Sequence, residues 1–100
     1  VNRRAEIGFA LAASAQGQGR ATAAVTALLD FAFGRLGLHR VEADVDPDNT
    51  PSLRLLERLG FRREGLLRER WLAHGEPQDA VMLGLLAREW QQRNSERPTR

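Results

Sequence analysis

The chain has 100 residues, of which 42% are hydrophobic and 28% are charged, and its formal net charge is +2. This composition is typical of a folded globular protein, and the length allows one domain with a modest core. The chain contains no cysteine and no lysine, which excludes a disulfide framework, a thiolate-ligated metal, a cysteine nucleophile, a P-loop lysine and a Schiff-base lysine.

The first half of the chain is predicted to form a strand, a helix and a second strand. Residues 5–12 and 38–46 alternate between apolar and polar side chains, as half-buried strands do. Between them, apolar residues recur at helical spacing over 21–36, and Gly34 and Gly37 are predicted to end this helix. Two strands joined through a helix typically form a parallel, right-handed crossover unit.

The second half is predicted to form a short helix and an antiparallel hairpin. Thr50 is the predicted N-cap, with Pro51 at the first helical position, and Gly60 is the predicted C-cap. Strands are predicted over 61–73 and 79–86, joined by a His-Gly-Glu-Pro turn. The predicted fold class is therefore α/β, with the order strand-helix-strand-helix-strand-strand in a mixed sheet.

Residues 16–22, Gln-Gly-Gln-Gly-Arg-Ala-Thr, join the first strand to the first helix. Two glycines permit a tight turn, and the N–H groups at the start of a helix attract anions such as phosphate oxygens. A tight turn without a ligand is the simpler interpretation. A Rossmann dinucleotide site is a further alternative, but Thr22 holds the third glycine position and only one parallel unit is predicted.

Two motifs, the second in two parts, occur in a fixed order that resembles a known family. Residues 16–21 read Gln-x-x-Gly-x-Ala, residues 49–52 read Asn-x-x-Ser, and residues 57–61 read Glu-Arg-Leu-Gly-Phe. They resemble the acetyl-CoA loop and the second helix of the GNAT family of N-acetyltransferases, in particular its ribosomal-protein N-terminal acetyltransferase subgroup. The resemblance implies a partial GNAT fold, in which residues 1–90 form a truncated acetyl-CoA-binding domain and residues 91–100 form a frayed tail.

The resemblance also implies that acetyl-CoA is the cosubstrate. Its pantetheine arm would lie along the first strand and its pyrophosphate on the loop. The expected acetyl-CoA-binding residues are Leu11, Ala12, Gln16, Gly17, Gln18, Gly19, Arg20, Ala21, Thr22, Asn49, Ser52 and Arg58. No metal is expected, because the calcium-like run over 44–48 has Asn49 where a calcium loop needs glycine.

The expected catalytic residues are Ser52 and Glu69. Many relatives use a tyrosine as hydrogen-bond donor to the departing thiolate, but that position holds Leu56 and the chain has no tyrosine. Ser52 is therefore the expected donor, as in the ribosomal-protein subgroup, although a serine there also suits helix capping. The base of some subgroup members falls at Trp71, so Glu69, on the same predicted strand face, is the candidate base. A solvated strand carboxylate is the structural alternative for Glu69.

Two functions stay open at this point. The first is an acetyltransferase that moves an acetyl group from acetyl-CoA to an amine, either a protein N-terminus or a small molecule, by direct attack. The second is a non-catalytic acyl-CoA-binding or assembly module, because the family's acceptor-side strands have no counterpart before Val1. The first strand then has an open apolar edge at Ile7, Phe9 and Leu11, so we expect a homodimer or a missing N-terminal segment to pair with it.

Other partners are not expected. No apolar run approaches the roughly 20 residues of a membrane-spanning helix, and residues 1–4 are not followed by a signal-peptide core. The arginine pairs, such as residues 62–63, have no interleaved aromatic residues, which makes nucleic acid an unexpected partner. The expected location is the cytoplasm.

Overall fold

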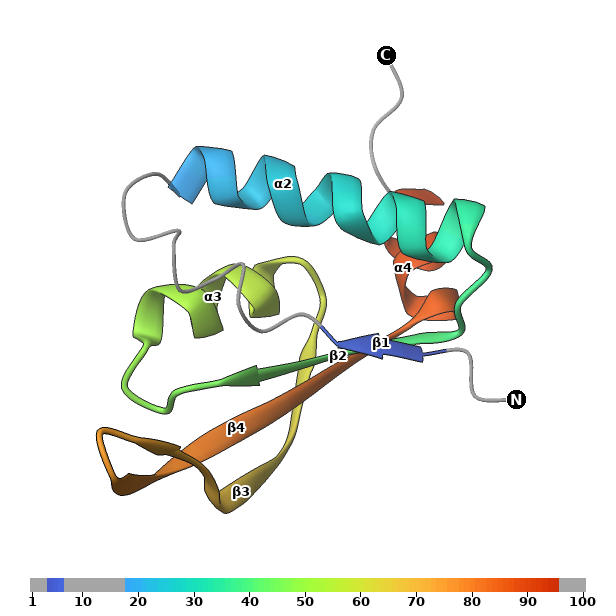
Figure 1. Cartoon of the computed structure of the whole chain (residues 1–100). Coiled ribbons are helices and arrows are strands. Elements are labelled where there is room, and N and C mark those ends of the chain that lie inside the picture. The colour runs from blue at the N-terminus through green and yellow to red at the C-terminus, as the bar shows by residue number, and fades with distance from the viewer. Residues whose placement is uncertain (1–3, 7–17, 96–100) are drawn as a thin grey trace.

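The computed structural model describes residues 4–6 and 18–95, and Figure 1 shows its strands and helices in the predicted order. In chain order the elements are β1 (Arg4–Glu6), α2 (Gln18–Asp30), the π-helix η2 (Phe31–Arg35), β2 (Arg40–Val45), α3 (Thr50–Arg58), β3 (Arg62–Ala73), β4 (Glu76–Leu86) and α4 (Ala87–Ser95). Within the described residues, no helix is long and apolar enough to cross a bilayer.

The strands form one mixed sheet in the order β1-β2-β4-β3. β1 runs parallel to β2, whereas β4 runs antiparallel to both β2 and β3. The predicted parallel crossover and antiparallel hairpin are therefore confirmed. Residues 7–12 of the predicted first strand lie outside the described residues, and with them the apolar edge predicted at Ile7, Phe9 and Leu11.

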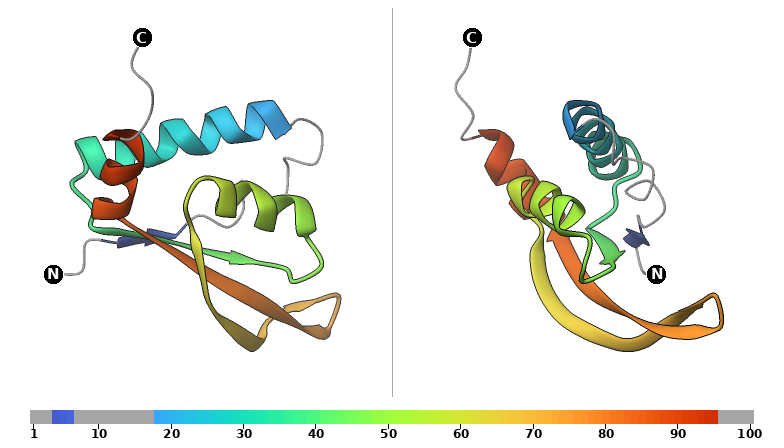
Figure 2. Two further views of the ribbon diagram at one scale, coloured as in Figure 1. Left: turned by 180° about the vertical axis from the view of Figure 1, so that it is seen from behind. Right: turned by 90° about the vertical axis from the view of Figure 1, so that its left-hand side faces the viewer.

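The described helices cover one face of the sheet (Figure 2). α2 lies above β1 and β2, while α3 and α4 lie toward β3 and β4. Val41 and Ala43 of β2 and Leu83 and Leu85 of β4 are buried on this face in the core cluster. Each large apolar side chain buried there stabilises the fold by about 1.5–3 kcal/mol. This packing holds α2 and α3 with their N-termini at the same end of the molecule (Figure 1).

The first helix differs from the prediction at its C-terminal end. After Asp30 it continues as η2, in which the Leu36 N–H donates to the Phe31 carbonyl at 3.0 Å. A π-turn contains one residue more than an α-turn, so the buried face shifts along the sequence. Leu36, predicted to face the core, is therefore 54% exposed. Gly34 lies inside η2 rather than ending it, and Gly37, with φ of 66°, follows the helix.

The hairpin and the C-terminal helix are also longer than predicted. His74 and Gly75 alone form the turn, with φ of 53° and 80°, and two positive φ values suit the tightest hairpin turn. β4 therefore begins at Glu76. α4 extends to Ser95, so the segment predicted as a tail from residue 91 begins as a helix.

The other sheet face carries an ion-pair network that spans three strands. Arg40 of β2 donates from Nε to Glu42 at 2.8 Å and also pairs with Glu64 of β3. β4 lies between β2 and β3, and Gly84 occupies the crossing point. A Cβ at Gly84 would lie 2.7 Å from the Arg40 guanidinium and from the Glu64 carboxylate. The Arg40–Glu64 ion pair therefore requires glycine at position 84. A glycine inside a strand often marks such a close approach of other groups.

Replacement of Gly84 by alanine is expected to lower the free energy of unfolding by about 1 kcal/mol. A Cβ there would displace the partly exposed Arg40–Glu64 pair and crowd the crossing, at a cost of about 1–3 kcal/mol, while alanine in a strand regains about 0.5–1 kcal/mol. Gly65→Ala is the matched control, because a Cβ there meets nothing within 4 Å. Urea unfolding measures both variants, and equal values for the two would contradict the crossing role of Gly84.

The same network predicts a dependence of stability on pH. The hydrogen bond from Arg40 lowers the pKa of Glu64 below its ordinary value, so Glu64 stabilises the fold above that ordinary value and loses its contribution as the pH falls through the lowered pKa. The Glu64 side chain is 36% exposed, and solvent screening limits the effect to less than about 1 kcal/mol. Urea unfolding between pH 3 and 7 should show the difference between the wild type and Glu64→Gln shrinking in acid; parallel curves would refute this.

Candidate functional site

The N-termini of α2 and α3 lie at the same end of the molecule (Figures 1 and 2). α2 begins at Gln18, earlier than predicted, so the backbone of residues 18–22 forms its first turn. Unpaired N–H groups and the positive end of the helix dipole favour a bound anion there. Ala21 is buried and Arg20 is exposed. Among the expected acetyl-CoA ligands, Leu11, Ala12, Gln16 and Gly17 lie outside the described residues.

The start of α3 places Asn49 and Ser52 together. The N-cap is Asn49 and not Thr50, because the Asn49 side-chain oxygen accepts the Ser52 N–H at 3.3 Å. Asparagine is among the best N-cap residues, and Pro51 fits the first turn of the helix. Leu59 and Gly60 end α3, and Gly60 has a φ of 106°, so its prediction as the C-terminal cap agrees with the left-handed backbone that favours glycine there.

Ser52 itself is only 2% exposed. Its backbone N–H makes the hydrogen bond to the Asn49 side chain that caps α3. The N-cap of α3 is thus Asn49, and Ser52 is a buried residue of the first turn whose chemical role stays a prediction.

Glu69 lies in a bulge of β3. The register between β3 and β4 shifts between Leu67 and Trp71, and Glu69 has a φ of 51°, which is rare outside glycine. Its N–H donates to the Asp79 carboxylate at 2.9 Å instead of to a strand carbonyl. Strict alternation fails across a bulge, so the prediction that Glu69 and Trp71 share one strand face loses its basis.

The bulge borders an open hollow. Residues 66–70 line it, and its volume is about 630 Å³. Arg70 donates from Nε to Asp44 of β2 at 3.0 Å, and the Asp44 side chain is 5% exposed. This partly buried ion pair ties the bulge to the end of β2, four residues before Asn49. Bulges and unusual backbone angles occur often at functional sites.

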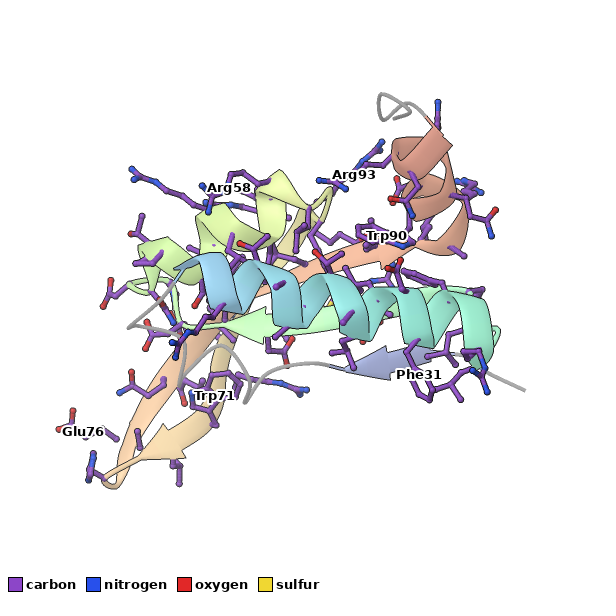
Figure 3. All side chains as sticks on the ribbon, turned by 90° about the horizontal axis from the view of Figure 1, so that it is seen from above. Phe31, Arg58, Trp71, Glu76, Trp90 and Arg93 are labelled. Carbon is purple, nitrogen blue, oxygen red and sulfur yellow. The ribbon has the colours of Figure 1, made fainter. Side chains whose placement is uncertain are left out.

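Arg58 and the run of acidic residues lie elsewhere. Figure 3 shows Arg58 projecting from the side of α3 away from α2, so Arg58 is not brought to the first turn of α2, and its contact with acetyl-CoA stays a prediction. Asp44 pairs with Arg70, and Asp46 accepts the Asp48 N–H at 2.8 Å. The described residues contain no group of three acidic or histidine side chains that could hold a metal ion.

Comparison with protein families agrees with this architecture. Residues 1–62 match the model described as an acetyltransferase (GNAT) domain. The chain belongs to the GNAT family. The match covers the crossover unit, the segment between β1 and α2, and α3, which are the elements that build the candidate site.

Individual GNAT relatives extend the similarity to α4. "Uncharacterized N-acetyltransferase p20" of Bacillus licheniformis is 48% identical over 89 residues, which are 89% of this chain and 50% of the relative. "Putative ribosomal N-acetyltransferase YdaF" of Bacillus subtilis is 41% identical over 91% of this chain and 50% of its own length. A crystal structure of the spermidine/spermine N-acetyltransferase SpeG from Vibrio cholerae has 31% identity and a TM-score of 0.75 over 83% of this chain and 48% of that chain. The chain thus spans about half the length of these GNAT relatives.

Two polar residues near the hollow were not predicted from the sequence. Asp79 holds the Glu69 amide, and Arg70 neutralises Asp44. An aspartate at a strand position and an arginine beside Glu69 are each ordinary on an exposed strand. Their pairing depends on the bulge and on the strand order, which periodicity alone does not indicate.

Proposed function

We propose that this GNAT chain binds acetyl-CoA and transfers its acetyl group directly to an amine. The observation that carries the proposal is that the N-terminus of α2, which suits a pyrophosphate, lies at the same end of the molecule as the start of α3, where Ser52 is buried. The relatives named as N-acetyltransferases, among them a ribosomal and a spermidine enzyme, support an amine acceptor.

In the proposed reaction the amine nitrogen attacks the carbonyl carbon of the thioester. The carbon–sulfur bond then breaks, the amine proton passes to a carboxylate, and CoA leaves as a thiolate. Ser52 would donate a hydrogen bond to the departing sulfur. Asn49, whose oxygen caps α3, would turn its NH₂ group toward the pantetheine arm. The products are the N-acetylated amine and CoA.

Glu69 is the proposed base. It lines the hollow beside the Asp44–Arg70 ion pair, and its backbone is fixed by Asp79. A bulge can direct a side chain that regular pairing would leave on the wrong face. The hollow would then receive the amine acceptor.

Calorimetry with CoA, acetyl-CoA and NAD, followed by an acetyl-transfer assay, tests the proposal. We expect binding of CoA and acetyl-CoA but not NAD, and transfer to an N-terminal peptide or to spermidine. Binding of NAD alone would overturn the assignment. Binding of CoA with no transfer to any amine would favour the non-catalytic acyl-CoA-binding module.

We further propose that the edge of β1 pairs with a strand from a second copy or from an additional N-terminal segment. Among the described residues β1 pairs only with β2. Leu28, Phe31 and Leu36 of α2 and the residues that follow it are 37%, 50% and 54% exposed, and Phe31 lies on the β1 side of the helix (Figure 3). Open edges and apolar patches mark interfaces. A clean monomer in sedimentation at micromolar concentration would contradict the homodimer.

We also propose a cytoplasmic location, with which the absence of cysteine is compatible.

A further inference from the structure

A side-chain hydrogen bond joins the far end of α2 to α4. The Trp90 indole N–H donates to Asp30 Oδ1 at 2.9 Å. Asp30 is the last residue of α2, where the helix passes into η2, and Trp90 is 2% exposed. Figure 3 shows Trp90 between α2 and α4, on the opposite side of α2 from Phe31.

The buried side chains of α2 include Ala21, Val25 and Leu29, whose apolar contacts are non-directional. A hydrogen bond restricts both distance and direction, with N–H···O lengths confined to about 2.7–3.2 Å. The Trp90–Asp30 bond is therefore suited to set the orientation of α2.

Trp90 is itself held firmly. The Arg93 guanidinium lies over its ring, 5.3 Å from the centroid. At the start of α4, Glu89 accepts the Leu86 N–H at 3.0 Å, and the Ala87 N–H donates to the His39 carbonyl at 2.9 Å. α4 is thus tied to the sheet, so Trp90 connects α2 to a fixed support.

We propose that Trp90 is a positioning residue for acetyl-CoA, because through Asp30 it sets the tilt of α2 and so places the N–H groups of the first turn. The inference rests on the proposed function. From Asp30 to Gln18 the helix rises about 18 Å, so a tilt of about 5° moves the first turn by roughly 1.6 Å. Hydrogen-bond lengths vary over only about 0.5 Å, so a displacement of this size would break the hydrogen bonds from the first turn to a phosphate oxygen.

Three variants and two measurements test the inference. Trp90→Phe keeps the apolar ring but removes the donor, Asp30→Ala removes the acceptor, and Asp30→Asn retains the acceptor oxygen without the charge. Calorimetry measures CoA affinity, and hydrogen exchange measures the protection of the α2 amides without CoA. Arg63→Ala is the control, because it removes an exposed ion pair to Glu57 that does not involve α2.

We expect Trp90→Phe and Asp30→Ala each to weaken CoA binding by about tenfold and to speed exchange in α2. Asp30→Asn and Arg63→Ala should stay within about twofold of the wild type. Asp30 is exposed, so the Asp30 pair remains informative if Trp90→Phe does not fold. Equal CoA affinity in all folded variants, or equal loss in Asp30→Asn and Asp30→Ala, would overturn the positioning role while leaving the proposed function standing. A wild type that binds no CoA would instead overturn the proposed function and this inference together.

Discussion

Replacement of Ser52 by alanine is expected to lower the turnover of acetyl transfer by about 100- to 1000-fold, the usual cost of removing one donor to a developing negative charge. Affinity for CoA should stay within about twofold, because the variant keeps the backbone N–H that Asn49 caps. Steady-state kinetics and calorimetry on the same preparations measure the two quantities. A large split between turnover and affinity is the expected result.

The structure makes this test sharper than the sequence alone permits. Ser52 is buried, and helix capping is carried out by the Asn49 side chain, so loss of the hydroxyl should not unravel α3. Asn49→Ala is the matched control for loss of the helix cap. This variant should lose about 0.5–2 kcal/mol of stability, whereas Ser52→Ala keeps the cap. If Ser52→Ala loses turnover and CoA affinity in equal measure, Ser52 is a binding residue and not the donor.

The order of elements was predictable because each segment carries a strong local signal. The alternation around Val41 and Ala43 and the glycines at residues 37 and 60 agree with the observed strand and helix ends. The π-turn at Phe31 was not predictable, because helical periodicity assumes a constant number of residues per turn. The N-cap differed by one residue because both Asn49 and Thr50 are good caps.

The positions of the candidate residues in the fold were predictable where a motif is continuous in sequence, as at the start of α2 and at Asn49–Ser52, and their roles stay predictions. It was not predictable where the contacts cross strands. Gly84 permits the Arg40–Glu64 pair only because β4 lies between β2 and β3, and the Trp90–Asp30 bond joins residues 60 positions apart. Such contacts depend on the order of the strands and the packing of the helices, which the periodicity of a single sequence does not reveal.

Loss of the Asp44–Arg70 ion pair is expected to have a large effect on the free energy of unfolding. The Asp44 side chain is 5% exposed and the Arg70 side chain is 43% exposed. Removal of Arg70 leaves a carboxylate buried without its cation, which typically costs about 3–5 kcal/mol. Removal of Asp44 leaves an arginine whose side chain is already 43% exposed, and partly exposed pairs contribute about 1 kcal/mol or less. The two single variants should therefore differ strongly, although they break the same contact.

We expect Arg70→Ala to lower the free energy of unfolding by about 2–4 kcal/mol and Asp44→Ala by about 1 kcal/mol, as measured by urea unfolding at pH 7. The double variant should be about as stable as Asp44→Ala, since no unpaired carboxylate remains. Because Arg70 adjoins Glu69 in the bulge, Arg70→Ala should also raise the KM for the amine while CoA affinity is retained. Equal destabilisation by the two single variants would show that the burial of Asp44 does not determine the cost of breaking the ion pair. The conformation of the bulge would then have to be stabilised by other contacts.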